Sequence, residues 1–127
     1  MMGLEPLVVV VEDDAASRKT LGRVLRAGGF EAAMYESAEA YLQSPPASDP
    51  IALLLDVNLE GMSGIDLLRR LRSAGSTVPV VIITAYDNPR ARDEAERLGC
   101  VAYLRKPCEA ETILTIVRTL ERERDAH

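Results

Sequence analysis

The feature that most constrains this chain is a run of five apolar residues, 51–55, that ends on the acid Asp56. A short apolar run that is stopped by turn residues is typical of a strand buried on both faces of a sheet. A loop with two glycines and then a helical pattern from about residue 65 follow the acid. Asp56 is therefore predicted at the carboxyl end of a buried strand, the edge where ligands bind to open α/β sheets.

The remainder of the chain repeats this alternation of strands and helices. Apolar runs predict strands, and helical periodicity predicts helices, over the following ranges: strands 7–11, 30–35, 51–56, 80–84 and 101–105, and helices 15–27, 38–43, 64–74, 89–98 and 109–123. Asp14 and Ser37 are expected to cap the first two helices, and Pro89 to lie in the first turn of the fourth. This alternation predicts an α/β fold with a parallel sheet covered by helices on both faces.

Length and composition limit the broad class of protein. At 127 residues we expect one domain, residues 1–127, with its core at about residues 6–121. A net charge of -5 argues against direct nucleic acid binding. No apolar segment is long enough to cross a membrane, and no basic leader precedes the first apolar run, so we expect a cytoplasmic location. Cys100 and Cys108 flank the last predicted strand, on the order of 20 Å apart, and are expected to be reduced thiols.

Side chains capable of chemistry stand at the ends of four predicted strands. Glu12 and Asp13 follow the first strand, Asp56 ends the third, Thr84 ends the fourth and Lys106 follows the fifth. Each has an ordinary explanation by itself, because strand-end acids often cap helices, threonine favours strands and lysine is common on surfaces. The carboxyl ends of parallel strands share one edge, however, so we expect these five side chains to meet.

Such a cluster fits the chemistry of phosphoryl transfer. Neighbouring carboxylates repel one another unless a cation is present, and a site made only of oxygen ligands suits Mg²⁺. A bound Mg²⁺ can bridge protein and phosphate oxygens, while Lys106 would add positive charge and Thr84 a hydroxyl donor. Asp56 lies centrally and is the natural acceptor of a phosphoryl group, since a carboxylate is already an ionised nucleophile.

Four segments together resemble the receiver domain of two-component response regulators. They are Val-Val-Glu12-Asp13-Asp14, Leu-Leu-Asp56-Val-Asn58-Leu-Glu-Gly-Met-Ser-Gly64, Ile-Ile-Thr84-Ala85 and Tyr103-Leu-Arg-Lys106-Pro107. The resemblance covers essentially the whole chain. It implies a single receiver domain with a flavodoxin-like, doubly wound, five-stranded parallel sheet in the order 2-1-3-4-5 and five helices.

The resemblance also implies a metal set around the acceptor. Asp56 would be the phosphoacceptor, and Mg²⁺ would be held by Glu12, Asp13, Asp56 and the main-chain carbonyl of Asn58. Glu60 stands where the family often has proline, so we expect a looser loop after Asp56.

The same resemblance assigns a switch. Lys106 would pair with the acceptor and then with the phosphate, and Thr84 would move to bond the phosphate. Tyr103 would be the aromatic switch residue that turns inward when Thr84 moves. The bond between Lys106 and Pro107 resembles the family's cis peptide. Cys108 stands where the family often has phenylalanine, so we expect weaker packing there.

The function implied is a phosphorylation switch in two-component signalling. A sensor histidine kinase or a phosphotransfer protein would supply the phosphoryl group, and the domain would catalyse only its own phosphorylation and dephosphorylation. The output face would comprise helix 89–98, strand 101–105 and helix 109–123, open to a homodimer partner or an effector. The main alternative is a receiver-like interaction module that works without phosphorylation. A haloacid-dehalogenase-like phosphohydrolase would need a second acid where this chain has Asn58.

Overall fold

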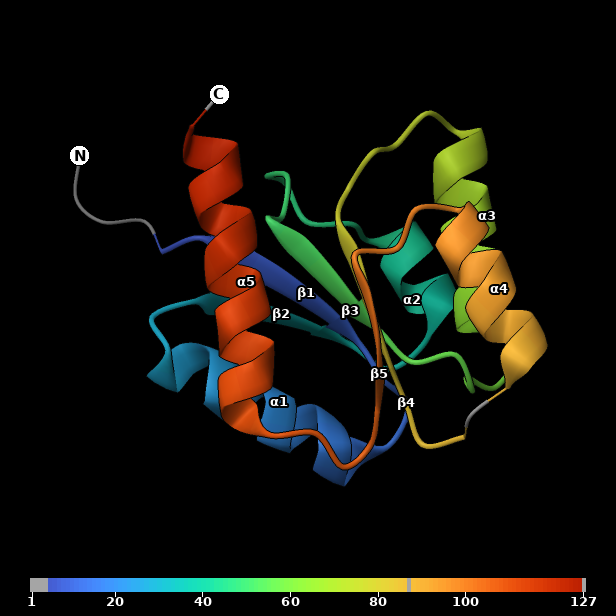
Figure 1. Ribbon diagram of the computed structural model, residues 1–127, viewed down its shortest axis with the longest axis horizontal. Helices are drawn as coiled ribbons and strands as arrows, with labels where there is room; N and C mark the ends of the chain where they lie inside the picture. The colour runs from blue at the N-terminus through green and yellow to red at the C-terminus, as the bar shows by residue number, and fades with distance from the viewer. Residues whose placement is uncertain (1–4, 87, 127) are drawn as a thin grey trace.

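The chain, seen as a computed structural model that describes residues 5–86 and 88–126, alternates strands and helices along its whole described length (Figure 1). The elements are, in order, β1 (Leu7–Val11), α1 (Ala15–Ala27), β2 (Glu31–Tyr35), α2 (Ala38–Gln43), β3 (Ala52–Leu55), α3 (Gly64–Ser73), β4 (Val80–Thr84), α4 (Pro89–Arg97), β5 (Ala102–Arg105) and α5 (Ala110–Asp125).

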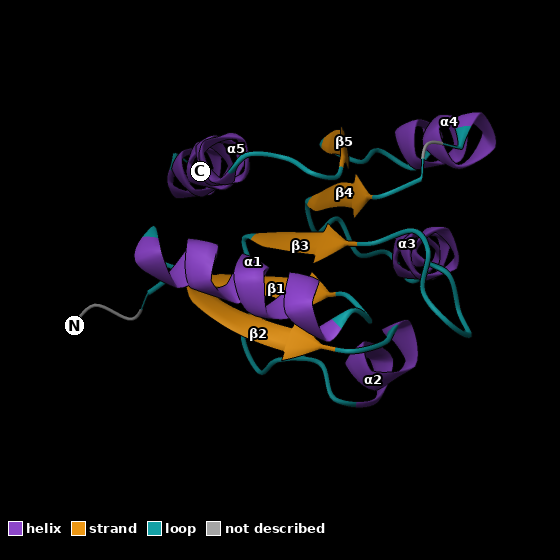
Figure 2. Ribbon diagram, turned by 90° about the horizontal axis from the view of Figure 1, so that it is seen from below, coloured by secondary structure: helices purple, strands orange, loops and turns teal. Residues whose placement is uncertain are grey.

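All five strands are parallel and lie in the order β2-β1-β3-β4-β5. The register pairs Val11 with Tyr35 and with Leu55, and Thr84 with Arg105, so the strands finish near one edge. Helices α1 and α5 cover one face of the sheet, and α2, α3 and α4 cover the other (Figure 2). The predicted fold class and strand order are confirmed.

Two apolar layers hold the helices to the sheet. Alternate residues of a strand point to opposite faces, so Val8 and Val10 pack under α1 and α5, whereas Val9 and Val11 pack under α2 and α3. All four valines are essentially inaccessible to solvent. Burial on both faces explains why the central strands read as unbroken apolar runs.

The predicted element bounds differ from the observed ones by at most two residues at any end. The third strand is shorter than expected, since Ile51 and Asp56 lie just outside the ladder, and α5 continues to Asp125, two residues past its predicted end. The predicted caps are present, because Asp14 accepts a hydrogen bond from Ser17 N at 2.8 Å and Ser37 accepts one from Ala40 N at 3.0 Å.

The buried faces of α3 and α5 are broad. Leu67 and Leu114 are buried, and Leu71 and Ile116 are partly buried against the same apolar layers. These helices pack against a neighbouring helix as well as the sheet, so their apolar surface is wider than a single stripe. Among the described residues, no helix has the length and apolar character needed to cross a membrane.

Candidate functional site

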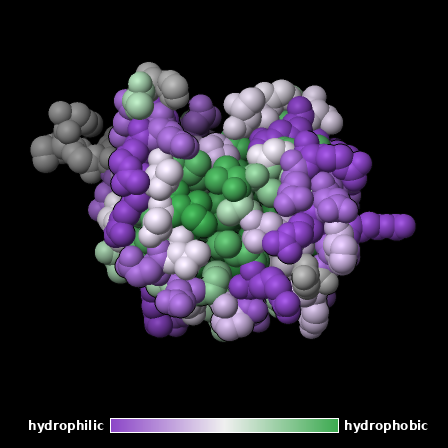
Figure 3. Space-filling model, in the orientation of Figure 1, coloured by the Kyte–Doolittle hydropathy of each residue, from purple (hydrophilic) through white to green (hydrophobic). Residues whose placement is uncertain are grey.

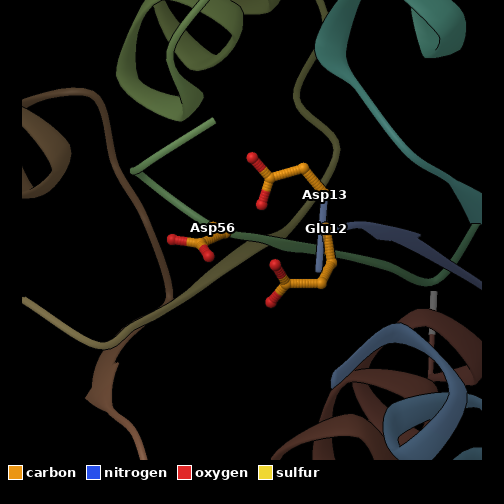
Figure 4. Close-up of side chains that lie close together, drawn as sticks. All are labelled: Glu12, Asp13 and Asp56. Atoms are coloured by element: carbon orange, nitrogen blue, oxygen red, sulfur yellow. The ribbon is translucent and has the colours of Figure 1, made fainter. Parts of the chain in front are cut away.

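The predicted strand-end residues come together at the carboxyl edge of the sheet. Glu12 and Asp13 leave β1, and Asp56 leaves β3 directly beside them (Figure 4). One carboxylate oxygen from each of the three lies within 4.8 Å of the others. Glu12 and Asp56 are buried, with 2% and 7% of their surface exposed, whereas Asp13 faces solvent. The cluster therefore combines two carboxylates that are shielded from water with a third, Asp13, that is open to it.

Burial raises the pKa of Glu12, and the nearby charge of Asp56 raises it further, although hydrogen bonds from Lys106 and from Asp14 N act in the opposite direction. Carboxylates this close repel one another, and a cation between them would relieve that repulsion. The donor set is entirely oxygen, which fits a hard ion such as Mg²⁺. Glu12, Asp13 and Asp56 therefore meet the requirements of a magnesium site, while the part assigned to the Asn58 carbonyl stays a prediction.

Lys106 joins the two buried acids. Its Nζ donates to Glu12 Oε1, and to Asp56 Oδ2 at 3.2 Å. Burial alone would lower the pKa of Lys106, but the hydrogen bond to Glu12 and the charges of both acids outweigh it, so the pKa is raised and the ammonium stays charged. The expected cis peptide between Lys106 and Pro107 is present.

Asp56 itself is oriented from two sides. Its Oδ2 receives the Lys106 hydrogen bond, and its Oδ1 accepts from the backbone N–H of Asn58 at 2.9 Å. These two contacts fix the plane of the carboxylate at the end of β3. A carboxylate held in one orientation is better placed to attack an incoming group than a freely rotating one.

Thr84 lies at the same edge but bonds to different partners. Its side chain is fully buried, and its Oγ1 accepts a hydrogen bond from Asn58 Nδ2 at 2.9 Å. Tyr86 N and Tyr86 O lie at longer distances of 3.4 Å. The backbone N–H of Lys106 donates to Thr84 O at 2.8 Å, but within the described part of the chain no hydrogen bond joins the Thr84 side chain to Asp56 or to Lys106.

Tyr103 shares a face of the sheet with Thr84. It pairs in register with Ile82, two residues before Thr84, and alternate strand residues point to the same side. The tyrosine is partly buried in the apolar layer under α3 and α4. The guanidinium carbon of Arg92, from α4, lies 5.0 Å from the centre of its ring, within the range of a cation–π contact. Its ring therefore contacts α4.

Hydrogen bonds hold the loop after Asp56, while the looseness expected from Glu60 stays a prediction. The backbone N–H of Gly64 donates to Val57 O at 3.0 Å, and that of Glu60 faces Asp13 Oδ2 at 3.4 Å. Glu39 of α2 accepts from Met62 N at 2.9 Å. A carboxylate from another element therefore restrains the loop where the family often uses the rigidity of proline.

Two supporting residues were missed by the sequence argument. Arg18 Nη1 donates to the main-chain carbonyls of Glu12 at 2.8 Å and Asp13 at 3.4 Å. Its position four residues after the Asp14 cap, one turn into α1, could have suggested this contact. Glu39 carried no such signal, because its partner is a backbone amide far away in the sequence.

A groove of about 640 Å³ lies between α1 and α5 beside Lys106, and Cys108 is one of its lining residues. Cys108 also packs against the apolar layer under α1 and α5, and the weaker packing expected there stays a prediction. Cys100 and Cys108 are both free thiols, as predicted. Burial raises the pKa of each, so both favour the neutral, weakly reactive form.

Comparison with known proteins shows which class of protein has this fold and site. The pattern of the response regulator receiver domain matches residues 8–118, and the chain belongs to that family. A receiver domain is a signalling domain of two-component systems rather than a classical enzyme.

Individual response regulators are similar to this chain in sequence. The chain is 31% identical over 116 residues to the transcriptional regulatory protein FixJ of Bradyrhizobium diazoefficiens, covering 91% of this chain and 57% of FixJ. It is 39% identical over 110 residues to the response regulator protein FleR of Pseudomonas aeruginosa, covering 87% of this chain and 23% of FleR. The chain thus spans 57% of the length of FixJ and 23% of the length of FleR.

Solved structures show the same fold. The crystal structure of FixJ-N has a TM-score of 0.83 and 30% identity, covering 94% of this chain and 96% of that one. A CheY-like receiver domain protein from Methanospirillum hungatei has a TM-score of 0.87 at 21% identity, covering 97% of this chain and 99% of that one.

Proposed function

We propose that this chain is a phosphorylation switch that accepts a phosphoryl group on Asp56 from a sensor histidine kinase or a phosphotransfer protein. The observation that carries the proposal is the position of Lys106. Its ammonium contacts Asp56 and Glu12 at the point where three carboxylates lie within 4.8 Å. A surface salt bridge would need only one acid, whereas a phosphoryl site needs acids for a metal and a cation for the phosphate.

In the reaction, an Asp56 oxygen attacks the phosphorus of phosphohistidine. An O–P bond forms, the N–P bond breaks, and the imidazole of the kinase leaves. No general base is required, because the attacking carboxylate is ionised. Glu12, Asp13, Asp56 and the Asn58 carbonyl would hold Mg²⁺, which would supply positive charge to the phosphoryl oxygens. Lys106 would remain charged and move its hydrogen bond from the carboxylate to the phosphoryl group.

The output depends on Thr84 and Tyr103. To donate to a phosphoryl oxygen, the Thr84 hydroxyl would turn its hydrogen away from Tyr86 O, and Tyr103 would leave Arg92 and turn inward. Phosphorylation would thus bias an existing equilibrium between two arrangements of the β4–α4 segment.

The surface over β5 fits an output role. Figure 3 shows an apolar strip in the centre of this face, between the more polar surfaces of α5 and α4. Val101 before β5 is 47% exposed, and Ala102 and Leu104 are partly buried. Exposed apolar surface between α4 and α5 suits a homodimer partner or an effector. The chain itself would not bind nucleic acid, given its net charge of -5. Free thiols agree with a reducing cytoplasmic setting.

Intact mass measurement after incubation with acetyl phosphate tests the proposal. We expect a gain of one phosphoryl group that requires both Mg²⁺ and Asp56, and no gain for Asp56→Asn or in the presence of EDTA. Asp49→Asn, at an exposed acid away from the site, is the control and should be phosphorylated normally. A gain that persists in Asp56→Asn would refute the acceptor assignment. Absence of any gain, combined with normal partner binding by Asp56→Asn, would favour the phosphorylation-independent module.

A further inference from the structure

Helix α4 is held to the rest of the domain by very little apolar surface. Ala95 is its one fully buried residue, and Ala91 is partly buried against the same layer. Most of the helix is charged, with an exposed outer face. An element with so few buried apolar contacts needs another kind of attachment to stay in place.

Two arginines of α3 provide that attachment. Arg69 Nη2 pairs with Glu94 Oε1 in the middle of α4 at 2.8 Å, while its Nη1 pairs with Asp66 at 2.8 Å. Arg72 Nε donates to the carbonyl of Leu98 at 2.8 Å. Leu98 caps the carboxyl end of α4, where unsatisfied carbonyls carry partial negative charge, so a guanidinium is well suited to bind there.

The two attachments differ in strength. Arg72 also donates to the carbonyls of Val78 at 2.9 Å and Ser76 at 3.2 Å, so it fastens the end of α4 to the fixed loop before β4. The Arg69–Glu94 pair is more accessible, with side-chain exposures of 48% and 33%, and salt screens such pairs. A cleft of about 580 Å³ lies beside it between α3 and the first turns of α4.

We propose that the Arg69–Glu94 ion pair is a latch that holds α4 against α3 in the unphosphorylated domain, and that the contact between Arg72 and the Leu98 carbonyl is the pivot about which α4 moves. Arg69 and Glu94 are thus positioning residues of the switch. The consequence for signalling rests on the proposed function, because it assumes that α4 moves when Asp56 is phosphorylated. The latch itself is a property of the unmodified domain.

Amide hydrogen exchange of the unphosphorylated protein tests the latch. We expect Glu94→Gln to speed exchange in α4 by about two- to fivefold, the range that a partly exposed ion pair supplies. Glu96→Gln, the same change at an exposed position of the same helix with no ion pair to any described residue, should leave the rates unchanged. Raising the ionic strength from about 0.02 M to about 0.5 M should speed exchange in the wild type but not in Glu94→Gln.

A double-mutant cycle makes the test specific. Because Glu94 also pairs with Arg97 of α4 at 3.9 Å, Glu94→Gln should affect α4 at least as much as Arg69→Gln. The double variant should add nothing to Glu94→Gln if Arg69 acts on α4 only through Glu94. Exchange in α4 that is equal for Glu94→Gln and Glu96→Gln, or fully additive effects in the cycle, would overturn the latch.

Phosphorylation by acetyl phosphate then tests the link to signalling. Glu94→Gln should gain the phosphoryl group about two- to fivefold faster than the wild type and Glu96→Gln, since the latch no longer opposes the active arrangement. Faster exchange with an unchanged phosphorylation rate would overturn the regulatory part. If the wild type gains no phosphoryl group, the proposed function and the regulatory role fail together, while the exchange results still decide whether the latch exists.

Discussion

Gly64 gives the sharpest prediction, because the first residue of α3 lies against the peptide that carries the acceptor. A Cβ placed on Gly64 would lie 2.1 Å from the carbonyl oxygen of Asp56 and 2.9 Å from its carbonyl carbon. The Cα of Val57 would be 3.0 Å away. These are backbone atoms, so no side-chain rotation can relieve the overlap. Gly64→Ala therefore has to push α3 away from the end of β3.

The size of the effect follows from the hydrogen bonds that resist this movement. Asp56 N is bonded to Val11 O at 3.2 Å, and Gly64 N to Val57 O at 3.0 Å. Overpacking costs about 1–3 kcal/mol in a typical core, and a rigid neighbour favours the upper end. We expect Gly64→Ala to lower the free energy of unfolding by about 3 kcal/mol, which is roughly 10 °C in Tm for a domain of this size.

Urea unfolding followed by circular dichroism is the assay, and Gly22→Ala is the matched control. A Cβ on Gly22 would meet only the flexible ends of Arg26 at 3.0 Å and Met34 at 3.5 Å. Because Gly22 is inside α1, alanine should stabilise the protein by up to about 1 kcal/mol. The same chemical change is thus expected to have opposite signs at two positions. A loss below about 0.5 kcal/mol for Gly64→Ala would refute the steric argument.

Two further predictions concern acids held by hydrogen bonds. Glu39→Ala should speed amide exchange at Met62 several-fold and weaken Mg²⁺ binding, because it removes the acceptor of the Met62 N–H. Glu39→Gln keeps an acceptor oxygen and should stay near wild type. Equal behaviour of the two variants would contradict a role for this hydrogen bond. Hydrogen bonds lower the pKa of Asp14, Glu39 and Glu94 in the folded state, so the unfolded chain binds more protons in acid. The stability from these groups is present at neutral pH and should fall as the pH drops below about 4.5, opposed in part by Glu12, whose pKa burial raises. Urea midpoints that stay constant from neutral pH to about pH 3 would contradict this linkage.

The alternation of strands and helices could be predicted because it depends on local patterns. The buried strands are apolar runs in the sequence, and Asp14 and Ser37 marked the starts of the helices that they cap. The meeting of Glu12, Asp13 and Asp56 was also predictable, since the carboxyl ends of parallel strands share one edge whatever the strand order. The order itself came from the resemblance to a family, because apolar runs carry no information about which strand lies beside which.

The tertiary structure determined the hydrogen-bond partner of each polar group. Glu39 binds the backbone amide of Met62, and Arg72 binds the carbonyl of Leu98, yet every residue has a backbone amide and carbonyl, so no sequence letter marks those particular ones. The hydrogen bond between Asn58 and Thr84 likewise spans 26 positions and depends on two strand ends lying side by side. The sequence by itself determined which chemical groups stand at the ends of the strands, because that follows from position along the chain. Only the tertiary structure determined which hydrogen bonds hold those groups in place, because these bonds depend on distances between helices and strands.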